Sequence, residues 1–574
     1  MGKKTLITFT AVLGLAASMA HITFWDMRTD DSRQVESRAS YIVQGGSAES
    51  VAAIVRTVGG DITHELGVIH AVGATLTPAE AALLQDHPDV RRLYGNEAVE
   101  VAGKPVKDDG GAPTGSSEVM ETHYPSIVNA DAVHDMGFDG SGIGIAVLDT
   151  GLWKTSGIKM NPAGQPRIKA VYNAIDDDVV NVNSGDDPAG HGTHVASIAV
   201  SSLMTETGKF NGIAPGAHLV SVQAFDQYGN GTYADVIRAI DWVVRNKSKH
   251  KIRVLNLSFS AEARSHYWDD PINQAVMVAW QNEILVVAAA GNRGPDPMTI
   301  GVPGNVPYVV TVGAMTDNFT PADPSDDVLA SFSSAGPTAE GFVKPEMLAP
   351  GGHVVGLMQG NSELATTYPE FYEGGRYFSM SGTSQATAVI SGVAALVLQA
   401  EPWRSVDEVK CKLMASARPA VAADGTLAYS IFQQGAGLAD AYAAVMSQDV
   451  DCANNGLHID NDIDGVQHFG GRANQNSDGN YYLMGLDGYM WTNGYMWTNG
   501  YMWTNGYLWT NGYMWTDGYM WTNGDVGADG YMWTDGYMWT DGYMWTNGYM
   551  WTNGYMWTNA LTEMATMSGW VDQE

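Results

Sequence analysis

The sequence predicts an α/β protein whose largest part is a mostly parallel sheet with helices on both faces. Between residues 121 and 446, continuous apolar runs such as GIGIAVL and ILVVAAA alternate with helical stretches such as YADVIRAIDWVVRN. Strands that are apolar along their whole length are typical of parallel sheets covered on both sides. The strand and helix patterns before this region are shorter, and after it a six-residue motif recurs many times. We therefore expect a small α+β module before the sheet and an all-β repeat of short strands behind it.

The N-terminal segment 1–20 predicts a cleaved export signal. Lys3 and Lys4 precede an apolar run, and the small residues Ser18 and Ala20 stand where a signal peptidase cuts. A membrane anchor is the alternative, although the run is short for a bilayer span. We expect a secreted, extracellular protein.

Residues 40–102 predict the small α+β module. The strand pattern SYIVQ is followed by the amphipathic helix AESVAAIVRTV, and a second strand, helix and closing strands complete the order. This order is that of a split βαβ fold, which is ferredoxin-like. Residues 103–120 are rich in Gly, Pro and Ser and predict a linker.

The charge and length of the chain limit its function. With 574 residues the chain is too long for one hydrophobic core, so several domains are expected. Its 63 acidic and 30 basic residues give a net charge of −33. Nucleic-acid binding needs a basic surface, so this class of partner is excluded.

The only two cysteines, Cys411 and Cys452, leave two interpretations open. In an exported protein they can pair, and closing a loop of this length stabilises by about 4 kcal/mol in the chain-entropy model. Alternatively, both remain free thiols.

Residues 447–488 are rich in Asp, Asn and Gly and predict a linker. Within it, Asp460, Asp462 and Asp464 alternate before a glycine, as in the first half of a calcium loop. The twelfth position is Gly471 and not glutamate, so the full loop is absent. A structural calcium ion and a solvated acidic turn both remain possible interpretations.

Residues 489–559 contain eleven copies of Tyr-(Met/Leu)-Trp-Thr, followed by a tail at 560–574. In a strand, Tyr and Trp would share one face, and the Asn-Gly and Asp-Gly joints favour hairpin turns. The aromatic residues either stack on one another and hold the array together, or form a strip that contacts glycans or a cell surface.

The segment GHGTH at 190–194 contains two histidines, which could bind a metal, transfer protons or have only a structural role. A zinc site of the H-E-x-x-H type is excluded, because no glutamate lies between the histidines. Instead, Asp149 ends an apolar strand, His191 opens a helix, Asn292 follows a strand and Ser384 begins a long apolar helix. Each residue alone has a structural explanation as a turn former or helix cap. Together they supply the carboxylate, imidazole, hydroxyl and amide donor that acyl-transfer catalysis uses.

These motifs resemble the subtilisin-like serine proteases, or subtilases. The resemblance extends over most of the region 121–446 and rests on four segments: VLDTGL (147–152), GHGTHVASIA (190–199), AAAGNRG (288–294) and SGTSQATA (381–388). It implies a subtilisin-like fold for residues 121–446 and a serine endopeptidase acting on proteins or peptides, with no cofactor needed for the chemistry. It also implies that residues 40–102 are a propeptide that inhibits the enzyme until it is cleaved, and we expect a monomer.

The resemblance also implies roles for individual residues. Asp149, His191 and Ser384 would form the catalytic triad, with Asn292 as the oxyanion donor. Substrate would bind along two extended segments and the turn after a strand, at Tyr233, Ser258, Ser260, Ala290 and Gly291.

The sequence departs from the family pattern beside the nucleophile. Gln385, Thr387 and Ala388 replace the usual methionine, small residue and proline, and Ser260 replaces a common glycine. All triad residue types are present, so we expect activity. A cell-surface or glycan-binding protein, with the repeat as its working part, is the alternative function.

Overall fold

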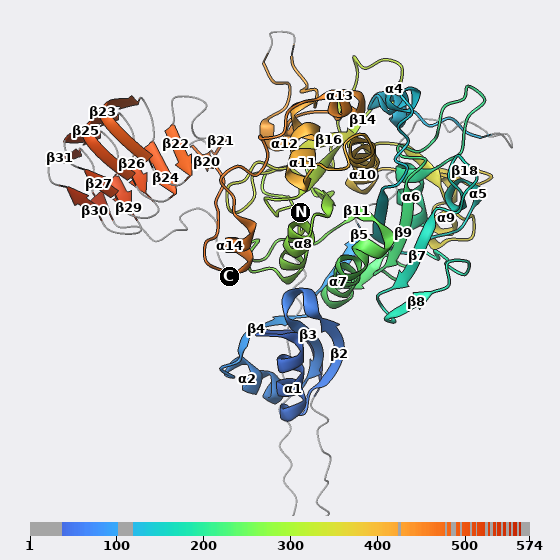
Figure 1. Ribbon diagram of the computed structural model, residues 1–574, viewed down its shortest axis with the longest axis horizontal. Helices are drawn as coiled ribbons and strands as arrows, with labels where there is room; N and C mark the ends of the chain where they lie inside the picture. The colour runs from blue at the N-terminus through green and yellow to red at the C-terminus, as the bar shows by residue number, and fades with distance from the viewer. Residues whose placement is uncertain are drawn as a thin grey trace, which may run out of the picture.

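The computed structural model describes residues 37–101, 119–422, 426–476 and 479–483, and the backbone of short strands between 490 and 563. Figure 1 shows an N-terminal module in blue, a large central domain, and the repeat as a separate stack of strands. The predicted signal (1–20) and most of the predicted linker (103–120) lie outside the described residues.

The N-terminal module is a four-stranded antiparallel sheet in the order β2-β3-β1-β4, with two helices. Its helices begin where side chains cap free amides: Ser47 accepts from the Ser50 amide, and Thr77 accepts from the Glu80 amide. Its elements are β1 (Ala39–Gly45), α1 (Ala48–Val58), β2 (Asp61–Leu66), β3 (Ala71–Leu76), α2 (Pro78–Gln85) and β4 (Val90–Gly95). This is the split βαβ order.

The central domain is built on a nine-stranded sheet, and the predicted α/β fold is confirmed. The main strand order is β15-β14-β13-β11-β6-β9-β7-β8, with β16 beside β14, and only the short β8 (Asp178–Val180) and β15 (Val328–Leu329) run antiparallel. The seven parallel strands are β6 (Gly144–Asp149), β7 (Ile168–Asn173), β9 (His218–Gln223), β11 (Ile252–Leu257), β13 (Leu285–Ala289), β14 (Val310–Thr316) and β16 (Met347–Pro350). Every residue of β6 and β13 is buried, as continuous apolar strands require.

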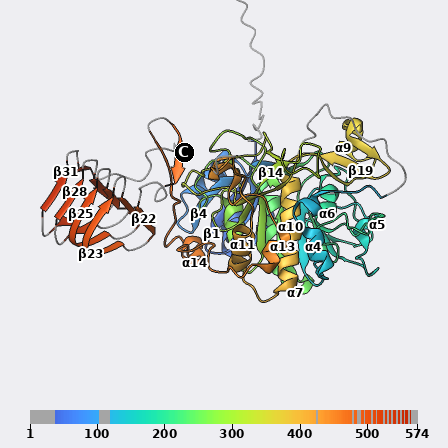
Figure 2. The same ribbon diagram turned by 90° about the horizontal axis from the view of Figure 1, so that it is seen from above.

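Helices cover both faces of this sheet (Figures 1 and 2). α6 (His191–Val200) and α10 (Thr383–Ala400) pack together on one face, and α7 (Tyr233–His250) and α8 (Pro271–Gln281) pack together on the other. α10 is the one helix in the described part of the chain that is long and apolar enough to cross a membrane, but 89% of it is buried. It is therefore a core helix of this domain.

Shorter elements surround the sheet. They are β5 (Ala98–Val101), α3 (Tyr124–Ile127), α4 (Ala130–Asp135), α5 (Ser156–Lys159), β10 (Asn230–Thr232), β12 (Phe259–Ser260), β17 (Val354–Leu357), α9 (Glu363–Thr367), β18 (Tyr372–Gly374), β19 (Tyr377–Met380), α11 (Val406–Ala415), α12 (Ile431–Gln434) and α13 (Ala441–Met446).

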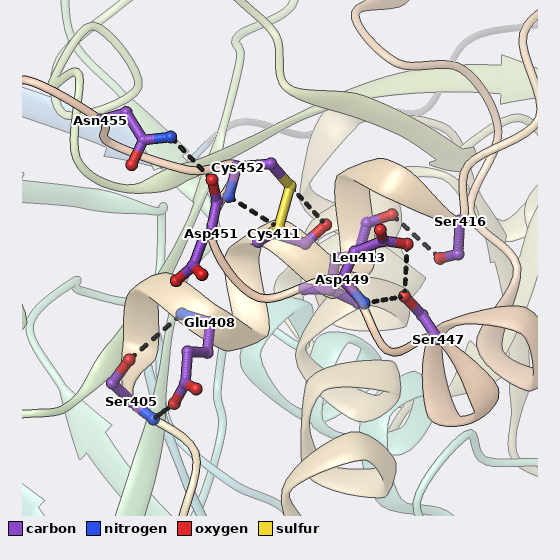
Figure 3. Close-up of a disulfide and its surroundings, with 10 residues drawn as sticks. All are labelled: Ser405, Glu408, Cys411, Leu413, Ser416, Ser447, Asp449, Asp451, Cys452 and Asn455. Atoms are coloured by element: carbon purple, nitrogen blue, oxygen red, sulfur yellow. Dashed lines mark hydrogen bonds between the residues drawn. A yellow bond between two sulfur atoms is a disulfide. The ribbon is translucent and has the colours of Figure 1, made fainter.

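The prediction that 447–488 is a linker is wrong for residues 447–476, which pack on the central domain. Cys411 in α11 and Cys452 form a disulfide (Figure 3), which decides between the two interpretations of the cysteines. Beyond it, α14 (Ile459–Ile463) lies against α8. A hairpin of β20 (Ala473–Gln475) and β21 (Tyr481–Leu483) follows. Residues that are distant in the sequence hold this segment in place, through apolar packing and through hydrogen bonds from tyrosine hydroxyls.

The described strands of the repeat pair in parallel and not as hairpins. Trp497 lies opposite Trp515 and Trp521 opposite Trp539, so each position pairs with its equivalent in the third motif along the chain. Three motifs therefore make one turn of a coil, and identical positions stack along it. Contact of the repeat with glycans or a cell surface stays a prediction.

Candidate active site

Asp149 and His191 meet at the carboxyl end of the central strand. Asp149 is the last residue of β6, and His191 is the first residue of α6. His191 Nδ1 donates to Asp149 Oδ1 at 2.6 Å, and each side chain is only 1% exposed. The contact sets the tautomer of the imidazole, because the nitrogen that faces the carboxylate must carry the proton.

The electrostatics of this pair favour a proton-accepting histidine. Burial lowers the pKa of His191, but the carboxylates of Asp149 and Asp187 outweigh it and leave the pKa above its usual value. His191 Nε2 is buried and has no hydrogen-bond partner in the described part of the chain. An imidazole held at Nδ1 and open at Nε2 can act as a general base.

Ser384 lies at the start of the core helix. It is the second residue of α10 and is fully buried. Its Oγ donates to the backbone carbonyl of Ser258 at 3.0 Å, and Ser258 Oγ donates back to the Ser384 carbonyl at 3.0 Å. Among the described residues, the structure thus joins Asp149 to His191, whereas it has no hydrogen bond from Ser384 to His191 Nε2.

Asn292 is oriented as a hydrogen-bond donor. It follows β13 and the turn at Gly291, whose φ of 107° suits glycine. Its Oδ1 accepts from the Thr383 amide at 3.0 Å and from Thr383 Oγ1 at 2.9 Å. With the oxygen occupied, the amide Nδ2 is the group that remains to donate. This amide can therefore serve an oxyanion.

A strand from the N-terminal part of the chain lies beside these residues. β5 runs between β10 and β12 in a three-stranded antiparallel sheet. Val99 pairs with Gly231 and Val101 with Phe259. Val99 is only 1% exposed, so its side chain enters the apolar interior of the domain. β5 therefore has the position that an extended peptide would take on this face.

The residues that were expected to bind substrate lie around β5 and Ser384. The Tyr233 amide donates to the Glu97 carbonyl just before β5, and its hydroxyl donates to Asp270. Ser260 is opposite Glu100 of β5. Ala290 is buried, and the Gly291 amide donates to Thr383 Oγ1 at 3.2 Å.

For Asp460, Asp462 and Asp464 the sequence left a structural calcium ion and a solvated acidic turn open, and calcium binding there stays a prediction. These residues lie in and just after α14, and Asp462 is buried where it accepts from the hydroxyls of Tyr267 at 2.5 Å and Tyr308 at 3.0 Å. No group of three or more His, Cys, Asp or Glu residues suited to a metal occurs among the residues that the structure describes.

Asp187 was not singled out in the sequence, yet it organises the loop before His191. Its Oδ1 accepts from Thr150 Oγ1 at 2.7 Å and from the Gly190 amide at 3.0 Å. Its Oδ2 accepts from the Thr193 amide at 2.7 Å and from Thr193 Oγ1 at 2.6 Å. Burial raises the pKa of Asp187, although all four donors favour the carboxylate. The only signal in the sequence is its position shortly before His191.

His194, the second histidine of GHGTH, has a structural position. Its Nε2 donates to the Phe378 carbonyl at 3.0 Å, and it is fully buried. Burial and the nearby His191 lower the pKa of His194 to about 3. It stays neutral at ordinary pH and takes no part in the proton transfer inferred below.

Comparison with known proteins agrees with this geometry. A model of the subtilase family matches residues 140–438. The chain is 34% identical over 348 residues to the serine protease AprX of Bacillus subtilis, covering 60% of this chain and 73% of AprX. It is 28% identical over 423 residues to subtilisin E of Bacillus subtilis, covering 72% and 94% of the two chains.

A solved structure resembles the fold. Fervidolysin from Fervidobacterium pennivorans, a keratinolytic enzyme related to subtilisin, superimposes with a TM-score of 0.55 at 21% identity. The match covers 72% of this chain and 62% of fervidolysin, and at this identity it bears on the fold alone. The family match over more than half of the chain, with the relatives above, leads to one conclusion: this chain belongs to the subtilase family of serine proteases.

Proposed function

We propose that the chain is a secreted serine endopeptidase that is made as a self-inhibited precursor. His191 Nε2 takes the hydroxyl proton of Ser384 while its oxygen attacks a peptide carbonyl, and an acyl-enzyme forms. Asp149 holds Nδ1–H and stabilises the imidazolium. Asn292 Nδ2 and the Ser384 amide stabilise the oxyanion. His191 then protonates the leaving amine, and water releases the acyl group by the same steps.

The reaction requires one rearrangement of the nucleophile. The Ser384 hydroxyl, which donates to the Ser258 carbonyl, must turn toward His191 Nε2. That nitrogen is without a hydrogen-bond partner among the described residues, so no other contact has to break on the histidine side.

The observation that supports a self-inhibited precursor is the position of β5. It pairs with β10 and β12 where a substrate strand would pair, so the chain blocks its own groove. The N-terminal module adds polar contacts to the peptidase domain outside the groove. Its Gln44 donates to Gln274 at 2.7 Å, and its His64 lies 3.0 Å from Asp235. We infer that cleavage after β5 releases this module and opens the site.

The test compares the secreted wild-type protein with Ser384→Ala and with Ser141→Ala, a change at an exposed serine. Mass spectrometry should show loss of the N-terminal module in wild type and Ser141→Ala, and its retention in Ser384→Ala. Casein should be hydrolysed by the first two proteins only. Processing and hydrolysis by Ser384→Ala at the wild-type rate would refute the proposal.

The export signal at residues 1–20 supports secretion. Deleting these residues should retain the protein inside the producing cell. Appearance of the deleted form in the medium at the wild-type level would contradict secretion by this route.

A further inference from the structure

The pocket beside the nucleophile can be located from the pairing of β5. The last described pair of this sheet is Val101 with Phe259, and the next residue of the peptidase strand is Ser258. The carbonyl of Ser258 accepts from Ser384 Oγ at 3.0 Å. A substrate strand in the place of β5 therefore reaches the nucleophile just beyond Phe259. The side chain before its cleaved bond must fit between the Ser258–Ser260 segment and the turn that holds Asn292.

Two glycines and one hydroxyl meet in this space. A Cβ added at Gly291 would lie 2.9 Å from Ser260 Oγ, and a Cβ added at Gly301 would collide with the same hydroxyl. Ser260 Oγ is buried and has no hydrogen-bond partner in the part of the chain that the structure describes. Leaving a buried hydroxyl unpaired is unfavourable, so a ligand that accepts its hydrogen bond would be favoured. The hydroxyl also takes up room that a glycine would leave open.

The positively charged side chain of Arg293 lies beside the same space. Arg293 Nη2 is 3.2 Å from the position of a Cβ at Gly301, and it donates to the Ala261 carbonyl at 3.3 Å. A guanidinium has five N–H donors, so donors remain for a further acceptor. Arginine pairs well with carboxylates because its fork of donors matches their geometry.

We propose that Ser260 and Arg293 together restrict this pocket to short side chains and favour aspartate among them, so that the enzyme cleaves after aspartate. This inference rests on the proposed peptidase function and names its substrate class. The Ser260 hydroxyl donates to one carboxylate oxygen, and Arg293 supplies the opposite charge. Long and aromatic side chains are excluded by the hydroxyl between the two glycines.

The experiment measures kcat/KM on peptides that differ only in the residue before the cleaved bond: alanine, asparagine, aspartate, leucine or phenylalanine. The wild-type enzyme should cleave the aspartate peptide fastest and the phenylalanine peptide slowest. Ser260→Gly should raise kcat/KM for leucine and phenylalanine at least tenfold, because one methylene in such a pocket is worth roughly 10–200-fold. Arg293→Gln should lower the aspartate-to-asparagine ratio about tenfold.

Ser141→Gly, at an exposed serine, is the matched control and should leave all five values unchanged. A wild-type enzyme that prefers phenylalanine, or a Ser260→Gly variant with the wild-type profile, would overturn the pocket assignment while leaving the peptidase function intact. If the wild-type protein cleaves neither these peptides nor casein, the proposed function fails and the pocket assignment fails with it.

Discussion

Asp187→Asn tests whether one buried carboxylate holds the loop that positions His191. Each carboxylate oxygen of Asp187 accepts two hydrogen bonds, one from a backbone amide and one from a threonine hydroxyl. Asparagine keeps the shape but replaces one oxygen by an NH2 group, which cannot accept. The backbone amide of Gly190 or of Thr193 then loses its partner, together with one hydroxyl.

The magnitude follows from the number of contacts. Hydrogen bonds to a charged group contribute about 1.5–3 kcal/mol each, so losing two costs about 3–6 kcal/mol. We expect a loss near the low end of this range, because burial disfavours the carboxylate and raises the pKa of Asp187. With roughly 2 °C per kcal/mol for a large domain, the range corresponds to a fall in Tm of about 6–12 °C, and we expect a value near the lower limit.

The assay is calorimetry of the precursor in a Ser384→Ala background, which prevents self-digestion. Asp186→Asn is the matched control, because Asp186 is the adjacent aspartate and is exposed. In the active background, Asp187→Asn should also lower the fraction of sites labelled by a fluorophosphonate. A Tm for Asp187→Asn that is indistinguishable from that of Asp186→Asn would refute the reasoning.

Three further outcomes are expected. Asn292→Ala should lower kcat about 10²–10³-fold with little change in KM, as for the corresponding donor of subtilisin; an unchanged kcat would exclude it as the oxyanion donor. Asp149→Asn should lower kcat about 3 × 10⁴-fold, which is the value for the corresponding aspartate of subtilisin. Asp149 raises the pKa of His191, and His191 must be neutral to act as a base. In Asp149→Asn the acid limb of the pH–activity profile should therefore move to lower pH. A move to higher pH would contradict this. Replacing Cys411 and Cys452 by serine should remove about 4 kcal/mol and lower Tm, with activity retained at room temperature; an unchanged Tm would show that the bridge is not stabilising.

The local patterns of the sequence were sufficient for the architecture. A continuous apolar run predicts that β6 is buried, and its end at Asp149 follows from the first polar residue. The glycine before His191 and the apolar residues after it predict the start of α6. Such signals depend only on neighbours along the chain, because strand and helix periodicity extend over a few residues.

Two local patterns favoured a local structure that differs from the observed one. The alternating aspartates at 460–464 fit a calcium loop, but Tyr267 and Tyr308 donate to Asp462 from far away in the chain and favour a packed helix. The Asn-Gly joints of the repeat fit hairpins, but stacking of every third motif pairs identical segments in parallel. In both cases, contacts between distant segments outweighed the local preference.

The order of residues along the chain was enough to predict which side chains form the site and which strands and helices carry them. Folding of the whole chain brings Asp149 and His191, 42 positions apart, within 2.6 Å and turns the side-chain oxygen of Asn292 to Thr383. It also placed β5 between β10 and β12 and aimed the Ser260 hydroxyl between two glycines. These contacts join segments from different parts of the chain, and such pairings depend on how whole elements pack and not on the order of residues within any one of them.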